Sequence, residues 1–122
     1  KHKLVDPIQY AFSIAADDLA DYEPTFTWEM APASDKQLEY LEKHGIYPES
    51  VTCAGMASLL IEKLKNRQIE GLATPKQIRF LERYGFLHVG LWTFEAASKM
   101  ITRISMNSWY LPRGIDPKSY QP

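Results

Sequence analysis

The sequence contains one segment twice. Residues 33–64 align with residues 73–104 at a constant offset of 40 and without a gap. Nine of the 32 aligned positions are identical: Ala33/Ala73, Lys36/Lys76, Gln37/Gln77, Leu41/Leu81, Glu42/Glu82, Gly45/Gly85, Ala57/Ala97, Ser58/Ser98 and Ile61/Ile101. Repeats of about 20–50 residues mark a small unit that buries its apolar face against a copy of itself. We therefore expect two similar units packed on each other.

Each copy has the pattern of a helix, a bend and a second helix. Ser34 and Thr74 are expected N-caps, and a glutamine three residues later completes a capping box in both copies. Gly45 and Gly85 stand where a first helix would end in a left-handed cap. Apolar residues at helical spacing then predict second helices over residues 53–65 and 94–106.

The flanking segments complete an all-α prediction. Thr52 and Thr93 are the expected caps of the second helices. Asp6 and Pro7 begin a helix that we expect to span residues 7–19, and residues 23–32 read as an extended connector. In that connector, we expect Phe26 and Trp28 to anchor on the helical body. We expect the residues after 106 to form an extended tail that packs back on the body through Trp109, Leu111 and Ile115. The last residues of the tail, Tyr120 to Pro122, are expected to fray.

Composition limits the classes of protein that this chain can represent. Its 122 residues fit one domain, which we divide into residues 1–32, repeat 33–72, repeat 73–106 and tail 107–122. No apolar run approaches the roughly 18 residues of a membrane span. Cys53, the only cysteine, cannot form an internal disulfide, so we expect a cytoplasmic chain. We also expect the isolated domain to be monomeric. Because the chain opens with Lys1, we also expect it to be part of a longer polypeptide.

Catalytic and metal-binding patterns are not evident. His2, His44 and His88 are far apart in sequence and do not have the paired spacing of a zinc site. Cys53 is expected to cap or pack rather than react, and the acidic cluster at 17–21 is expected to be a solvated helix end. We expect no enzyme activity, no cofactor and no metal.

Charge runs unevenly along the chain. Net charge is −5 over residues 1–35, zero over 36–70 and +4 over 71–122. Lys36 and Lys76 stand in the first turns of their helices, where the helix dipole favours an anion rather than a cation, and this placement recurs in both copies. The expected phosphate contacts are Lys36, Lys76, Arg79, Arg83, Lys99 and Arg103, whereas ordinary solvated lysines are the alternative interpretation.

Four stretches carry a family resemblance. Residues 5–32 (VDPIQYAFSIAADDLADYEPTFTWEMAP), 71–86 (GLATPKQIRFLERYGF), 92–96 (WTFEA) and 112–122 (PRGIDPKSYQP) resemble the C-terminal region of DEAD/DEAH-box, superfamily 2 helicases of prophages and other mobile elements. The resemblance implies an accessory role beside a helicase motor domain in the same polypeptide. The chain has neither a phosphate-binding loop of the form GxxxxGK[ST] nor a DEAD/DEAH box, so ATP hydrolysis is not assigned to any residue.

Two functions therefore remain open. The first is a non-catalytic domain that binds DNA through its phosphate backbone. The second is a protein-docking module that packs on the motor domain or a replication partner through Phe26, Trp28, Trp92 and Trp109.

Overall fold

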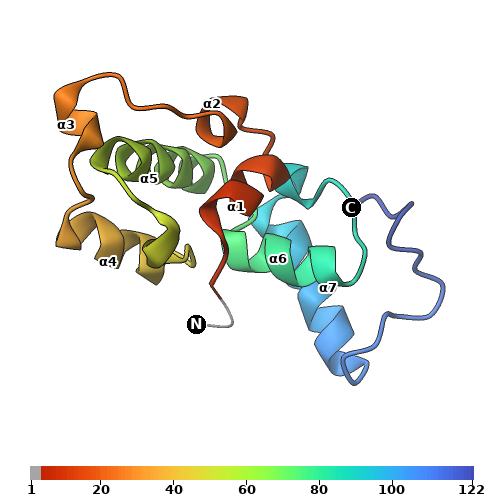
Figure 1. The fold of residues 1–122 in the computed structure, drawn as a ribbon. Coiled ribbons are helices and arrows are strands. Elements are labelled where there is room, and N and C mark those ends of the chain that lie inside the picture. Colours follow the sequence, from red (N-terminus) through yellow and green to blue (C-terminus); the bar gives the residue numbers. More distant parts are fainter. Residues whose placement is uncertain (1–3) are drawn as a thin grey trace.

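The computed structural model describes residues 4–122, and every regular element in that range is helical (Figure 1). The all-α prediction is therefore confirmed. The α-helices are α1 (Pro7–Ser13), α2 (Asp17–Ala20), α3 (Thr27–Met30), α4 (Asp35–Lys43), α5 (Ala54–Ile69), α6 (Pro75–Arg83) and α7 (Phe94–Met106). Two short 3₁₀ turns, η1 (Pro48–Ser50) and η2 (Val89–Leu91), lie in the connections α4–α5 and α6–α7.

The helices form two groups on either side of α1. Figure 1 shows α3, α4 and α5 on one side, α6, α7 and the C-terminal tail on the other, and α1 between them. The buried core runs through both groups, and its largest fully buried members include Tyr10, Leu41, Leu60, Leu81 and Phe86. Among residues 4–122, no helix is both long and apolar enough to cross a membrane.

Equivalent hydrogen bonds recur in the two groups at the offset of 40. The Ile46 amide donates to the Leu41 carbonyl over 2.9 Å, and the Phe86 amide donates to the Leu81 carbonyl over 3.2 Å. The intervening residues Gly45 and Gly85 have φ of 91° and 95°, the left-handed cap that the sequence predicts. Both first helices thus end alike, whereas the origin of the two segments by duplication remains an interpretation of the sequence.

The two glutamines join the helices of each group. Gln77 Oε1 accepts from the Thr74 amide over 3.0 Å, while its Nε2 donates to Ser98 Oγ over 2.9 Å. The Thr74 hydroxyl in turn accepts from the Gln77 amide over 3.2 Å, so both capping boxes form as predicted. Gln37 makes the same contacts with Ser34 and Ser58, over 2.9 and 3.1 Å. Each glutamine therefore caps one helix and holds the next helix against it.

The prediction of one helix over residues 7–19 is wrong. The chain leaves α1 at Ile14, passes through Ala15 with φ 56°, and forms α2 after the turn. The Ala16 amide donates back to the Ala11 carbonyl over 2.8 Å, which closes the end of α1. A Cβ at Gly90 would collide with the Ser13 carbonyl oxygen, so the end of α1 lies directly on η2. The close contact of this helix end with η2 accompanies a break that helical periodicity does not reveal.

Four predictions around α3 and α5 are also wrong. The connector contains α3, whose first turn is capped by the Glu29 carboxylate through the amides of Thr25 and Phe26. Phe26 and Trp28 are 64% and 57% exposed and therefore are not anchors. The N-cap of α5 is Cys53 rather than Thr52, and its side chain makes no capping hydrogen bond. α5 runs to Ile69, four residues beyond the predicted end, whereas α7 has the predicted bounds and Thr93 cap.

The tail folds back on the second group as expected, although not through all the predicted contacts. Leu111 and Ile115 are half-buried against the core, whereas Trp109 is largely exposed and touches Phe80 with its ring edge. Tyr120, expected to fray, packs its ring 5.6 Å from Phe86 and 5.5 Å from Trp92. An aromatic cluster therefore holds the end of the tail near η2.

Candidate anion-binding site

The predicted basic residues lie on three helices. Lys76, Arg79 and Arg83 follow one another along one side of α6 at spacings of three and four residues. Lys99 and Arg103 are one turn apart on α7, and Lys36 is in the first turn of α4. All of them except Arg79 are exposed.

Lys36 and Lys76 do not share one site. A Cβ at Gly45, just beyond the end of α4, would lie 2.9 Å from Lys76 Cγ, so the lysine stem covers that glycine. Lys36 is at the opposite end of α4, about 13 Å away at 1.5 Å per residue. The structure therefore separates the two first-turn lysines by the length of a helix.

The start of α6 offers few free backbone donors. Pro75 has no amide hydrogen, and the Thr74 and Gln77 amides are bonded within the capping box. The Lys76 amide is the first-turn donor that remains. One free amide therefore remains in the first turn of α6, and an anion here would depend mainly on side chains.

Arg79 has a structural contact in addition to its charge. Its Nη1 donates to Gln9 Oε1 over 3.0 Å, and the neighbouring Glu82 accepts from the Ser13 hydroxyl over 2.9 Å. These two bonds join α6 to α1. Arg79 is thus partly committed to the fold, unlike Arg83 on the same helix.

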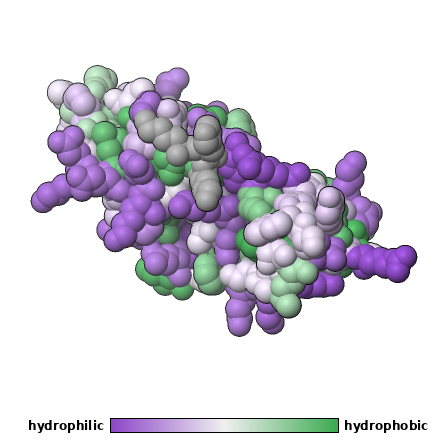
Figure 2. Space-filling view, turned by 90° about the horizontal axis from the view of Figure 1, so that it is seen from below, coloured by the Kyte–Doolittle hydropathy of each residue, from purple (hydrophilic) through white to green (hydrophobic). Residues whose placement is uncertain are grey.

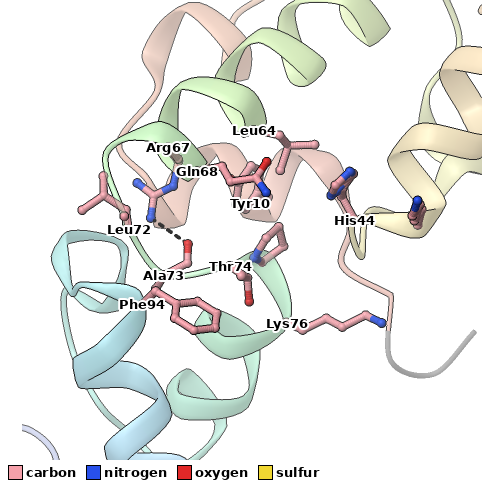
Figure 3. A pocket seen from close by; sticks show the side chains of 13 residues that line it. Tyr10, His44, Leu64, Arg67, Gln68, Leu72, Ala73, Thr74, Lys76 and Phe94 are labelled. Carbon is pink, nitrogen blue, oxygen red and sulfur yellow. Dashed lines mark hydrogen bonds between the residues drawn. The ribbon is translucent and has the colours of Figure 1, made fainter.

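A pocket of about 450 Å³ lies where the two groups of helices meet α1. Its walls come from α1, the ends of α4 and α5, residues 71–74, the start of α6 and the first residue of α7. Figure 3 shows Arg67 and Gln68 descending from α5, His44 on the far side, and Thr74 and Phe94 below. The basic lining residues are Lys43, His44, Arg67 and Lys76.

The charge of this lining is one-sided. Basic residues reach it from α4, α5 and α6, and no aspartate or glutamate lines it. Its apolar wall comprises Leu64, Leu72, Ala73, Pro75 and the ring of Phe94, which is 50% exposed. Such a lining suits a ligand that combines negative charge with an apolar or aromatic body.

Arg67 and Tyr10 form the deep part of the pocket. Arg67 Nη2 donates to the Ala73 carbonyl over 3.1 Å (Figure 3), while its buried Nε has no partner within the protein. Tyr10 is 1% exposed, and its hydroxyl likewise has no hydrogen-bond partner. Burial raises the pKa of Tyr10 to about 12, although the nearby Arg67 guanidinium partly opposes this rise. The hydroxyl is therefore protonated at neutral pH and can donate a hydrogen bond.

His44 lies against both an aromatic ring and a cation. Its ring centroid is 4.1 Å from that of Tyr40. Burial lowers the pKa of His44 below its usual value, and the charge of Lys43 adds to this effect. An anion placed between these groups would act in the opposite direction, because it stabilises the protonated ring.

Of the basic residues that line this pocket, only Lys76 is among the predicted phosphate contacts. The sequence pattern does not distinguish Lys43 and Arg67 from ordinary surface cations, and it offers His44 only as a candidate metal ligand. Their shared position depends on how α4, α5 and α6 pack, which no local motif encodes. The uneven charge of the chain points to residues 71–122, which contribute only Lys76 to the basic lining of this pocket.

Most cations of the second group have no acidic partner. Within the described part of the chain, one ion pair forms, between Lys63 and Asp18 over 2.9 Å. The basic residues after residue 70 are thus not neutralised by a carboxylate at that range. Figure 2 shows a face on which hydrophilic residues predominate and hydrophobic areas are small and separated.

Comparisons with known proteins do not extend these observations. No protein-family model, curated protein or solved structure matches the chain. Over residues 4–122, no group of three or more histidine, cysteine, aspartate or glutamate side chains is arranged to hold a metal ion.

Proposed function

We propose that this chain is a non-catalytic accessory domain that binds DNA through the phosphate backbone, in a phage-type DEAD/DEAH-box helicase. The contacts would come from Lys76, Arg79, Arg83, Lys99 and Arg103, with Lys36 as a more distant contact. The helicase assignment depends on the sequence resemblance, and the DNA-binding assignment depends on charge and geometry.

The observation that carries the proposal is the unpaired state of these cations. A surface that only needs solubility can pair its basic residues with nearby carboxylates. Here Glu82, which follows Arg79 on the same helix by three residues, bonds to Ser13 instead. Unpaired arginine and lysine side chains leave their donors available for phosphate oxygens.

Salt dependence provides the direct test. Affinity for labelled single- and double-stranded DNA should be measured by fluorescence anisotropy at about 50 and 200 mM salt. Engagement of six cations should reduce affinity by about 10³-fold over this range, because each phosphate contact releases counterions. Affinity that does not change with salt, or the absence of binding at low salt, would contradict DNA binding.

Charge-reversal variants locate the surface. Lys76→Glu/Arg83→Glu changes two exposed residues without removing the Arg79–Gln9 bond. Arg113→Glu/Lys118→Glu is the matched control, because it makes the same charge change in the exposed tail. We expect a large loss of affinity in the first variant and a small loss in the second. Equal losses would indicate a general charge effect rather than a surface on α6.

The docking alternative has one observation in its favour. Phe26, Trp28 and Met30 are all more than half exposed on and beside α3, although Trp92 is only 4% exposed and belongs to the core. A partner that covers α3 would be lost in a Phe26→Ser/Trp28→Ser variant at any salt concentration, while DNA binding would remain. Retained partner binding in that variant would exclude α3 as the docking surface.

A further inference from the structure

The pocket between α1, α4, α5 and α6 has features that a surface for backbone phosphates does not need. It is a concave site about 450 Å³ in volume, and one of its lining residues is Tyr10, whose buried hydroxyl has no hydrogen-bond partner of good geometry. A buried hydroxyl without a partner is unfavourable, and a ligand oxygen would offset this cost. We propose that the pocket binds the phosphate monoester of a nucleotide.

The charge of the lining favours a monoester over an internal diester. A phosphate monoester carries about −1.5 to −2 charges at neutral pH, whereas a backbone diester carries one. Lys43, Arg67 and Lys76 bring three permanent cations to the pocket from three helices, with no carboxylate among the lining residues. A dianion therefore gains more from this lining than a monoanion does.

The deep part supplies directed donors for the phosphate oxygens. Neither the buried Tyr10 hydroxyl nor the buried Arg67 Nε has a hydrogen-bond partner of good geometry in the described chain, although the Arg67 guanidinium lies close enough to Tyr10 to lower the pKa of its hydroxyl. The Arg67 guanidinium is held in place by its bond to the Ala73 carbonyl, so its orientation is set before a ligand arrives. Hydrogen bonds to a charged phosphate are among the stronger ones in proteins.

The apolar wall fits the remainder of a nucleotide. Phe94 is 50% exposed, and Leu64, Leu72 and Pro75 line the same space. A base that stacks on an aromatic ring adds to the affinity of a nucleotide ligand. The choice of a nucleotide rather than another phosphate monoester depends on the proposed function. The phosphate itself is assigned from the pocket alone.

A ligand of this chemistry can come from two sources. One is the 5′-phosphorylated end of a strand, and the other is a free nucleoside monophosphate. A short oligonucleotide labelled at its 3′ end should be titrated with and without a 5′ phosphate. The added monoester should raise affinity about tenfold or more, as one or two charge-assisted hydrogen bonds predict. Equal affinity for both oligonucleotides, with no competition by AMP, would overturn the proposal.

Competition separates the ligand classes, and the ratio of the affinities for AMP and for the phosphorylated oligonucleotide separates the two sources. AMP that displaces the phosphorylated oligonucleotide, while adenosine does not, supports the pocket as a nucleotide site. Displacement by inorganic phosphate as effective as that by AMP would overturn the role of the nucleoside. Stronger displacement by a phosphoserine peptide would overturn the nucleotide assignment in favour of a protein ligand.

Two variants test the residues. Tyr10→Phe removes only the hydroxyl. Because that group has no hydrogen-bond partner of good geometry, the free energy of unfolding should stay unchanged or rise, while the gain in affinity from the 5′ phosphate should fall. Lys43→Gln changes an exposed residue and should reduce the same gain without affecting the fold. Lys36→Gln, also on α4 but outside the pocket lining, is the matched control and should retain the gain. Loss of the gain in Lys36→Gln alone would overturn the pocket.

The two proposals fail separately. Salt-sensitive binding of unphosphorylated DNA without any effect of the 5′ phosphate would support the DNA-binding surface and overturn the pocket. Binding of AMP that Tyr10→Phe weakens, without affinity for unphosphorylated DNA, would support the pocket and contradict the proposed function.

Discussion

The glutamine that joins the two helices of each unit gives a prediction whose size follows from its contacts. Gln77→Ala removes the bond from the Thr74 amide at 3.0 Å and the bond to Ser98 Oγ at 2.9 Å. A contact of Nε2 with the Phe94 carbonyl at 3.4 Å is too long to add much. At about 1 kcal/mol for each of the two good bonds, the free energy of unfolding should fall by about 2 kcal/mol.

Urea denaturation of Gln77→Ala, Ser98→Ala and the double variant measures how this loss is divided. The pair should show a coupling energy of about 1 kcal/mol, because each single substitution breaks the same bond. A melting temperature lower by about 8 °C should accompany the loss in Gln77→Ala for a chain of this size.

The first unit supplies an internal replicate. Gln37 bonds to the Ser34 amide and to Ser58 Oγ over 2.9 and 3.1 Å, so the Gln37→Ala/Ser58→Ala cycle should give a similar coupling energy. Coupling near zero in both cycles would refute the reasoning, because the glutamine would then be only a helix cap. Coupling in one unit alone would refute the equivalence of the two units.

Three further predictions concern close packing and pH. Gly90→Ala should lower the free energy of unfolding by about 2–3 kcal/mol, because the added Cβ meets the Ser13 carbonyl of the backbone. Ser50→Ala at the aligned position should have little effect, and equal losses in the two variants would contradict this explanation. Gly55→Ala should lower the free energy of unfolding by a similar amount, because the Tyr22 hydroxyl and Glu29 Cβ occupy the space of the added Cβ. Glu95→Ala at the aligned, exposed position should lower it by only a few tenths of a kcal/mol, and denaturation curves that coincide for the two variants would rule out the contact with α3. Because burial lowers the pKa of His44 in the folded chain, the unfolded chain takes up a proton on this residue more readily, and the free energy of unfolding should fall as pH drops through about 6.5. A His44→Gln variant should lose less free energy of unfolding between about pH 8 and 5.5 than the unchanged chain, and identical losses would assign the pH dependence to other residues.

Local patterns in the sequence were enough to place most of the helices. The capping boxes, the left-handed glycines and the Thr93 cap are encoded within four or five neighbouring residues, and the structure has all of them. The break at Ala15 and the short helix α3 were missed, because both depend on contacts with residues far away in sequence. Ala15 adopts a positive φ without being glycine, and the residues just before it, Ser13 and Ile14, lie against Gly90.

The candidate site was harder to predict for the same reason. Periodicity places a cation on a helix face, but it does not say which helix ends meet. Lys43 and Arg67 are 24 positions apart and reach one pocket only because α4 and α5 both end beside the start of α6. The tyrosine that lines the pocket comes from α1, outside the repeat altogether.

The two units share their internal bonds but not their surroundings, and this difference locates the proposed binding sites. In the first unit, Gly55 leaves space for Tyr22 and Glu29 at the start of α5, so α3 covers that helix end. The aligned residue of the second unit is the exposed Glu95, beside Phe94, which opens onto the pocket. The end of the first helix differs too, because Gly45 is covered by the Lys76 stem whereas Gly85 faces Pro117 of the tail. One helix start is thus used for packing and the other remains open to a ligand, so similar units can support different surfaces without a change in their shared core.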